Sequence, residues 1–336
     1  MKFAKTTAQE FPNPEALMGL ISQYAGSQSE SAAQSSHWKH FAAETQLTTS
    51  ADGLISRIQG IGFGDYNESP LLWPFGILNF VTYFPFLKIP MPAFFKSLRL
   101  LIQLKAPMFS YDGFRHACLM AQLTPYLRRL ALANPTSKPV VCLIGDGWGL
   151  LSALIKKSFP EVRIVIVDLG KVLSFSCMFL QDRFPLGTFT VLDESATKLP
   201  ESDFTFIPAE KIRNLFSITD SLDFAINVAS MQEMDHHWIE FYFQWLRRGL
   251  KSGALFYCCN RESKTLPDGS MAVFSQYPWK SADRILLDEE PSFYRWFFAP
   301  GKTERNVSIV GVKIPFMHKF DGDNRHRIVE LSRLLE

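Results

Sequence analysis

The sequence predicts an α/β protein built on a doubly wound, mostly parallel sheet of seven strands with helices on both faces. Three observations predict this fold class. An apolar strand, a glycine turn and the start of a helix follow one another across residues 139–155. A second apolar, β-branched run occupies residues 163–167 and ends in an acid, Asp168. From there to the end of the chain, strand-like and helix-like segments alternate.

The chain divides into two parts at about residue 135. Residues 1–135 are expected to form a mainly helical N-terminal region that contributes cap, substrate or oligomer contacts, and residues 136–336 the α/β domain. Residues 26–36 are rich in Ser, Gln and Ala and indicate a linker or loop. Residues 113–134 have the pattern of a helix that stops at Asn134–Pro135.

The stretch from Leu71 to Leu87 has 17 residues and no charge, which is the lower limit for a membrane-spanning helix. Pro74 and Pro85 argue against a span. The composition favours buried or cleft-lining structure, with contact to a membrane surface as the weaker alternative. We therefore do not expect a membrane partner.

The elements of the α/β domain follow in order. Helices are expected after the first two strands, around 209–215, over 235–250 and over 326–335. The last two strands are expected to form an antiparallel pair that closes the edge of the sheet. The seven expected strands cover residues 139–144, 163–167, 204–208, 222–227, 254–259, 292–298 and 307–313.

Gly145, Gly147 and Gly149 form the turn between the first strand and its helix. Glycine tolerates positive φ and allows a ligand to approach the backbone closely. A turn at the carboxyl edge of such a sheet is where ligands bind. The dinucleotide fingerprint G-x-G-x-x-G requires glycine at position 150, which is Leu150. The G-x-G-x-G spacing therefore favours S-adenosylmethionine over a nicotinamide cofactor, and a turn that only packs well is the alternative.

Asp168 supports a nucleoside pocket. It follows Gly149 by 19 positions, close to the roughly 20-residue spacing at which an acid binds ribose hydroxyls. A carboxylate at that place accepts two hydrogen bonds from a vicinal diol. The alternative is that Asp168 caps the following helix.

The segment Asn227–Met234, together with Asp168–Leu173 and Tyr257–Arg261, resembles the sugar O-methyltransferases among the class I S-adenosylmethionine-dependent methyltransferases. In that family the fourth strand runs into an N-x-x-S-x-Q-E-M segment and the second into an acid and a leucine. The resemblance extends from Pro139 to about Lys313. It implies a Rossmann-like fold and methyl transfer to a hydroxyl of a sugar or glycosylated small molecule.

The resemblance also implies a cofactor, S-adenosylmethionine, with S-adenosylhomocysteine as product. One departure is Leu143, where many class I enzymes carry an acid. Other acceptors, such as a lipid, and a cofactor-binding protein without catalysis remain as alternatives. The residues implied for the cofactor pocket are Gly145, Asp146, Gly147, Gly149, Asp168, Leu169, Ile207, Pro208, Asn227, Val228, Ala229 and Ser230.

Methyl transfer to an alcohol needs alignment of the hydroxyl and removal of its proton. A base should follow the fourth strand, where Glu233, His236 and His237 stand close together. The alternative for the histidines is an exposed helix start with Asp235 as its N-cap. Neighbours on one short segment rarely converge on one ion, so no metal is expected.

Acceptor contacts are expected from three places. Asn260 and Arg261 follow the fifth strand at the carboxyl edge, with a surface ion pair as the alternative for the arginine. Tyr277 and Trp279 can form an aromatic platform for a sugar ring or pack in the core. Tyr111 and Arg115 precede the first strand by one helix and are placed by position alone.

The overall composition excludes some partners. The formal net charge is +2, and the basic residues are dispersed, so nothing favours nucleic acid. The five cysteines show no CxxC spacing, which suits buried thiols in a reduced cytoplasmic compartment. A homo-oligomer is compatible with the sequence.

Overall fold

The computed structural model describes most of the chain with a few gaps. The predicted linker at residues 26–36 lies outside the described part. The described residues are 14–24, 46–49, 55–59, 73–106, 110–133, 137–193, 195–299, 306–309, 311–319 and 322–333.

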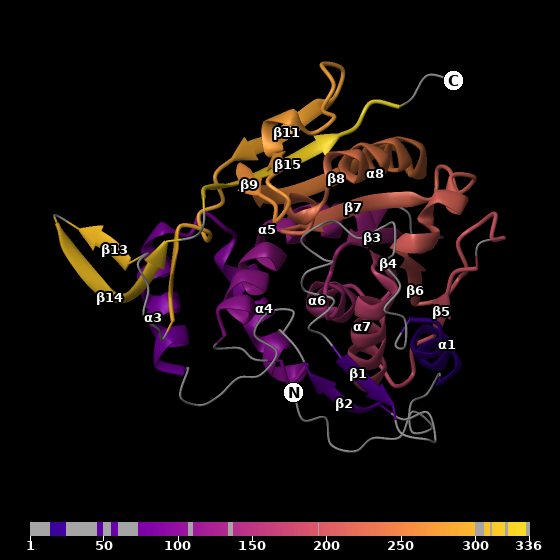
Figure 1. Ribbon diagram of the computed structural model, residues 1–336, viewed down its shortest axis with the longest axis horizontal. Coiled ribbons are helices and arrows are strands. Elements are labelled where there is room, and N and C mark those ends of the chain that lie inside the picture. Colours follow the sequence, from indigo (N-terminus) through magenta and orange to yellow (C-terminus); the bar gives the residue numbers. More distant parts are fainter. Residues whose placement is uncertain are drawn as a thin grey trace.

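The main sheet has eight strands in the order β11-β15-β8-β7-β3-β4-β6-β5 (Figure 1). The six strands from β8 to β5 run parallel, while β15 is antiparallel to both β8 and β11. The chain passes from β3 to β4 on one side and returns to β7 on the other, so the strand order reverses beside β3. The strands are β3 (Val140–Ile144), β4 (Arg163–Asp168), β5 (Phe189–Val191), β6 (Phe204–Pro208), β7 (Leu222–Val228), β8 (Leu250–Arg261), β11 (Arg284–Glu289) and β15 (Asn324–Glu330).

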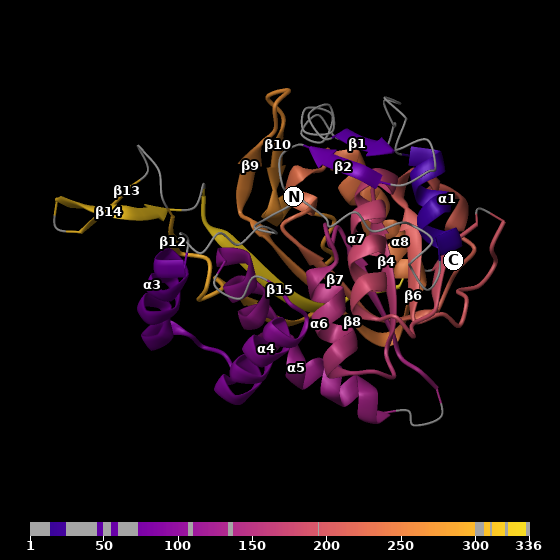
Figure 2. The same ribbon diagram turned by 90° about the horizontal axis from the view of Figure 1, so that it is seen from below.

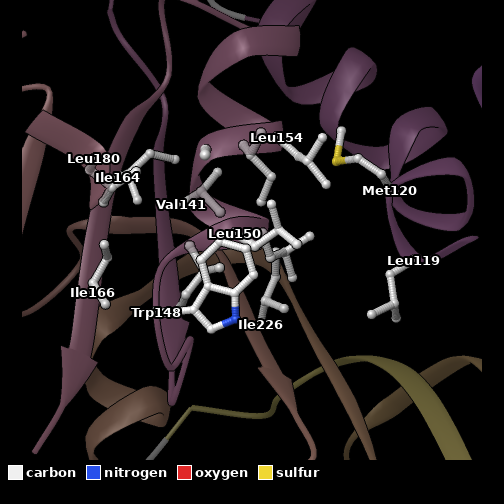
Figure 3. Close-up of a cluster of buried hydrophobic side chains, with 14 of the residues drawn as sticks. Leu119, Met120, Val141, Trp148, Leu150, Leu154, Ile164, Ile166, Leu180 and Ile226 are labelled. Atoms are coloured by element: carbon white, nitrogen blue, oxygen red, sulfur yellow. The ribbon is translucent and has the colours of Figure 1, made fainter. Parts of the chain in front are cut away.

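Side chains of β3 alternate between two cores, as the pleat of a strand requires. Val141 and Leu143 join the core formed with α5 (Tyr111–Ala133), α6 (Leu150–Ser158) and α7 (Gly170–Arg183). Val140, Cys142 and Ile144 join the core beneath α8 (His236–Gly249). Figure 3 shows part of the first core, where side chains of β3, β4, α5 and α6 meet. The prediction of helices on both faces is therefore confirmed.

The N-terminal region is less purely helical than expected. It contains the helices α1 (Pro14–Tyr24), α3 (Trp73–Tyr83), η3 (Phe84–Phe86) and α4 (Met91–Gln103), and also an antiparallel hairpin, β1 (Gln46–Thr49) and β2 (Ile55–Gln59). Helix α1 packs on α7 so closely that a Cβ on Gly170 would lie 2.4 Å from Cγ of Tyr24. None of the helices in the described ranges has the length and apolarity needed to cross a bilayer.

Helix α3 is fixed to the C-terminal half of the chain through its inner face. The side chain of Asn79 exchanges two hydrogen bonds with the backbone of Phe298, at 2.7 and 3.1 Å. The Tyr83 hydroxyl accepts hydrogen bonds from the amides of Arg295 and Trp296. Residues 71–87 were expected to be buried or cleft-lining. Within the described residues 73–87 this holds for the inner side chains Asn79 and Tyr83, but the outer side chains of α3 are exposed.

Two predictions for the C-terminal half are also wrong. The strands expected to close the main sheet instead form a separate three-stranded sheet, β12 (Trp296–Phe298), β14 (Val312–Lys319) and β13 (Asn306–Ile309). Figure 2 shows β13 and β14 projecting from the main sheet near α3. The expected final helix is strand β15, whose Ile328 and Val329 are buried on opposite faces of the sheet against the two cores.

The remaining elements are short. The segment after β8 forms a hairpin of β9 (Ser263–Thr265) and β10 (Met271–Val273). The eighth strand, β5, has three residues and was not expected from the sequence. Three short 3-10 helices complete the fold: η4 (Ala209–Leu215), η5 (Met231–Glu233) and η6 (Phe274–Gln276).

One buried ion pair fixes α8 to the C-terminal strands. Arg247 donates two hydrogen bonds to the carboxylate of Asp283, at 2.7 and 2.9 Å, and the amide of Ser332 donates a third at 2.8 Å. The Arg247 and Asp283 side chains are almost fully buried. Desolvation raises the pKa of Asp283, but the hydrogen bonds outweigh it and hold the pKa at about 2.

We expect Arg247→Met to lower the free energy of unfolding by about 3–5 kcal/mol, because it leaves a buried carboxylate without its partner. The pKa of Asp283 in the folded protein lies below the ordinary value of 3.8 for this carboxyl group. The contribution of the pair is therefore complete above about pH 4 and is lost as the pH falls towards 2. Urea denaturation of both proteins at neutral and at acidic pH measures these effects. Arg284→Gln breaks the exposed pair with Glu330 and should cost less than about 1 kcal/mol; equal losses in the two variants would contradict the assignment.

Candidate active site

A cavity of about 280 Å³ lies at the carboxyl ends of β3, β4 and β7, beside the reversal of strand order, where α/β sheets bind ligands. Helix α5 and the start of α8 supply its other walls. Its lining residues are Asp112, Arg115, His116, Leu143, Ile144, Gly145, Asp146, Gly147, Trp148, Leu151, Val167, Asp168, Leu169, Ala209, Ile226, Val228, Ala229, Ser230, Glu233, Met234, Trp238 and Tyr242.

The glycine turn forms one wall of this cavity. β3 ends at Ile144 and α6 begins at Leu150, as the sequence predicts. Gly145, Gly147 and Gly149 all have positive φ, at +74°, +63° and +92°. A Cβ on Gly145 would lie 2.1 Å from Oγ of Ser230. The absence of side chains therefore opens the cavity floor, while Gly149, which does not line the cavity, lets α6 start close to α7.

Two half-buried carboxyl groups face the cavity from this wall. Asp168 accepts hydrogen bonds from the amides of Gly147 and Leu169, at 3.0 and 2.8 Å. Asp146 accepts one from the amide of Ser152, at 3.1 Å. Desolvation raises the pKa of both carboxyl groups to about 7. Since α7 begins at Gly170 with Leu169 as its N-cap residue, Asp168 is not the cap of that helix.

A network of side-chain amides holds the ends of three strands together. Asn227 donates to the carbonyl of Ile144 at 2.9 Å and to Oγ of Ser230 at 2.6 Å. Asn260 donates to Oδ1 of Asn227 at 2.8 Å and accepts a hydrogen bond from the amide of Gln232. Asn227 and Asn260 are fully buried and therefore position the cavity wall without lining it.

Ala229 adopts a left-handed conformation, with φ +58°, at the end of β7. This conformation is uncommon for a residue other than glycine and costs about 1 kcal/mol or more. Its amide donates to the carbonyl of Cys259 at 2.8 Å. Val228, Ala229 and Ser230 all line the cavity, so this strained residue lies in the cavity wall.

Helix α5 contributes a polar face that the sequence only partly indicated. Arg115 forms an ion pair with Asp112 at 2.8 Å, and its guanidinium lies 5.6 Å from the ring centre of Tyr294. Nδ1 of His116 lies 2.7 Å from the backbone carbonyl of Asp112. Since a carbonyl only accepts, Nδ1 carries the proton and Nε2 carries a lone pair. Desolvation, assisted by the positive charge of Arg115, lowers the pKa of His116 to about 4, so the ring is neutral at physiological pH.

Of the three predicted catalytic residues, one lines the cavity and two do not. Glu233 lies in η5, lines the cavity and forms an ion pair with Lys264 at 2.7 Å. His236 and His237 are exposed at the start of α8 and do not line the cavity. His236 lies 3.3 Å from Glu240, one turn along its own helix. Asp235 occupies the N-cap position of α8.

Among the other residues predicted to contact cofactor or acceptor, some line the cavity and others do not. Arg115 lines the cavity, but Tyr111 and Arg261 do not. The Tyr111 hydroxyl donates a hydrogen bond to the carbonyl of Phe293. The backbone amide of Arg261 donates one to the side chain of Gln232. Ile207 is buried in the core and Pro208 pairs with Asp168 in the sheet; their neighbour Ala209 reaches the cavity. Tyr277 and Trp279 pack in the core beneath α8, where the Trp279 ring lies 4.8 Å from that of Phe243.

Several lining residues were not expected from the sequence. Asp112, Arg115 and His116 are spaced so that they share one face of a helix. Because a helix before the first strand was already predicted, this spacing could have identified them as a group. Trp148, Met234, Trp238 and Tyr242 complete an apolar wall. Among the described residues no three His, Cys, Asp or Glu side chains are arranged to hold a metal ion.

Comparisons with known proteins show no match to a protein-family profile or to a curated protein. Several solved structures are similar at low identity. The PH0226 protein from Pyrococcus horikoshii OT3 is 14% identical over 66% of this chain and 92% of that chain, with a TM-score of 0.38. Coclaurine N-methyltransferase bound to N-methylheliamine and SAH is 11% identical over 52% of this chain and 51% of that chain, with a TM-score of 0.36. The mitomycin 7-O-methyltransferase MmcR is 13% identical over 79% of this chain and 69% of that chain, with a TM-score of 0.34.

Proposed function

We propose that the chain is an S-adenosylmethionine-dependent O-methyltransferase that methylates a hydroxyl of a sugar or glycosylated small molecule. One observation carries the proposal: a glycine turn with no room for a Cβ at Gly145 lies beside two half-buried carboxyl groups at the strand-order reversal. This combination fits a nucleoside with a charged amino-acid tail. It also agrees with the family that the segment Asn227–Met234 resembles.

The residues of the cavity suit this cofactor. Asp168 has two backbone hydrogen bonds and still has lone pairs for ribose hydroxyls. The floor at Gly145 and Ser230 would hold the methionine portion, and Leu169 and Ala209 would lie beside the adenine. Bound S-adenosylmethionine would supply a methyl group on a positively charged sulfur, ready for an in-line displacement.

We infer that His116 accepts the proton of the acceptor hydroxyl. Its Nδ1 is committed to the carbonyl of Asp112, which fixes the tautomer with the lone pair on Nε2. Among the described residues, no hydrogen bond or ion pair engages Nε2, and the side chain lines the cavity. An amine acceptor that binds neutral does not need a base before methyl transfer, so this arrangement favours a hydroxyl.

The polar groups around His116 suit an acceptor rich in hydroxyls. Asp112 and Arg115 neutralise one another and provide both acceptors and donors of hydrogen bonds. Glu233 of η5, which forms an ion pair with Lys264, adds a carboxylate to the cavity lining. Alternating donors and acceptors of this kind bind the hydroxyls of a sugar ring.

Calorimetric titration of the purified protein tests the cofactor. We expect S-adenosylhomocysteine to bind with one site per chain and NAD not to bind, because Leu150 replaces the third glycine of the dinucleotide fingerprint. Transfer of a labelled methyl group to fractions of a metabolite extract then identifies the acceptor. Binding of NAD without S-adenosylhomocysteine would reject the proposal.

A further inference from the structure

The outer surface of α3, η3 and α4 is apolar and faces solvent. Trp73, Ile77 and Val81 recur at four-residue spacing along α3, so they share one face of the helix. About half of each of these three side chains is exposed. Patches of this kind on a soluble protein mark an interaction surface.

This face continues onto α4. Phe84 of η3 lies 6.4 Å from Phe95 of α4, measured between ring centres. Phe95 and Ile102 lie on one side of α4, two turns apart, and both are half exposed. We call the surface formed by Trp73, Ile77, Val81, Phe84, Phe95 and Ile102 the apolar band.

The charged residues of the segment that carries the apolar band have one sign. Residues 73–106 contain four basic residues and no acidic residue. Lys88, Lys96 and Arg99 are exposed, and Arg99 lies between Phe95 and Ile102 on the same side of α4. An aromatic and aliphatic surface bordered by lysine and arginine is typical of proteins that lie in the interface of an anionic membrane.

The β13–β14 hairpin packs against α3 at Phe75, on a different side of the helix from Trp73 and Ile77. The ring of Phe316 in β14 packs edge-on against that of Phe75 in α3, with 5.6 Å between the ring centres. Phe316 is about half exposed, and Val312 is exposed over more than half of its surface. Both elements project together on the side of the molecule away from β5 and β6 (Figures 1 and 2).

We propose that the apolar band binds the surface of a membrane that contains anionic lipids, without crossing it. The alternative occupant is a second copy of this chain. A symmetric contact through the apolar band would bring basic residues of both copies together with no acidic residue from residues 73–106, which costs free energy because like charges repel. Phospholipid headgroups, in contrast, complement the basic residues.

Flotation of the full chain with vesicles tests this proposal without reference to methyl transfer. We expect the protein to float with vesicles of phosphatidylcholine and phosphatidylglycerol and not with phosphatidylcholine alone. Lys96→Gln/Arg99→Gln should weaken binding about 25-fold, since each basic residue near an anionic surface contributes about fivefold. Ile77→Glu/Ile102→Glu should remove binding.

The matched control is Leu132→Glu/Leu186→Glu, which places two acids at sites that are 76% and 97% exposed, outside the apolar band. This control should float like the wild type, and circular dichroism should show all variants folded. Equal loss in the control, or a wild type that does not float with anionic vesicles, overturns the proposal. A wild-type dimer that Ile77→Glu/Ile102→Glu converts to a monomer would assign the apolar band to self-association instead.

Discussion

Replacing Gly145 by alanine is expected to weaken the binding of S-adenosylhomocysteine about 100-fold. The new Cβ would lie 2.1 Å from Oγ of Ser230, far inside contact distance. Ser230 cannot retreat easily, because its hydroxyl is held by Asn227 and by the carbonyl of Ile144. The clash is relieved by a shift of Ser230 or of the turn, which deforms the cavity floor that the ligand needs. A cost of about 1–3 kcal/mol that falls on the bound state lowers the affinity about tenfold for each 1.4 kcal/mol. Calorimetry measures the change.

Gly253→Ala is the matched control for this prediction. Gly253 also has a positive φ, +77°, but a Cβ there meets nothing within 4 Å. The substitution therefore carries the strain of the backbone without a clash at the cavity. We expect Gly253→Ala to bind the ligand as the wild type does. A folded Gly145→Ala variant with wild-type affinity would show that the cofactor lies elsewhere.

The parts of the site that depend on neighbours in sequence were predictable. Strand, glycine turn and helix are encoded within residues 139–155, and Asp168 closes the next strand. Parallel strands bring their carboxyl ends to one edge, so these groups had to meet. Val228, Ala229 and Ser230, which the family resemblance implied for the pocket, line the same cavity.

The parts of the site that depend on which side of a helix faces the cavity could not be predicted from the sequence. His236 and His237 follow Glu233 closely in sequence, but α8 buries Trp238, Ile239 and Tyr242 and therefore turns its two first residues to solvent. His116 lies far from Glu233 in sequence and reaches the cavity only because α5 packs across the sheet. Adjacency along the chain is a weak guide to which side chains converge.

The prediction of a helix over residues 326–335, where the structure has strand β15, was wrong for a related reason. Residues 326–335 carry apolar side chains at positions that suit a helix as well as a strand. The choice is made by pairing, because β8 on one side and β11 on the other complete the backbone hydrogen bonds of this segment. A single sequence does not show which strand partners a segment will find.

Replacing His116 by glutamine is expected to lower kcat about 10²–10⁴-fold while the affinity for S-adenosylhomocysteine stays the same. Glutamine retains most of the volume of the ring and can still donate a hydrogen bond to the carbonyl of Asp112, but its amide nitrogen cannot take up a proton. His236→Gln removes a histidine that does not line the cavity, and should leave the rate unchanged. Single-turnover methyl transfer with saturating cofactor measures the chemical step.

The pH dependence separates a proton acceptor from a structural role. The ring of His116 must be neutral to act, and burial lowers its pKa to about 4, so the rate it controls should fall only as the pH drops towards 4. A histidine of ordinary pKa, about 6.5, would lose its rate already below neutral pH. The other titratable groups that line the cavity are Asp112, Arg115, Asp146, Asp168, Glu233 and Tyr242. Desolvation raises the pKa of Asp146 and Asp168 to about 7 in the unliganded protein. In the proposed complex the cofactor would cover both of these carboxyl groups.

Two further variants decide between the candidate bases. His116→Ala leaves space beside Asp112, and added imidazole should restore part of its rate if the lost group was a proton acceptor. Glu233→Gln keeps the shape of the side chain and removes its charge, so it should raise KM for the acceptor more than it lowers kcat, because Glu233 is inferred to bind the acceptor. If Glu233→Gln instead loses kcat while His116→Gln keeps it, the proton passes to Glu233, and the inference for His116 is wrong.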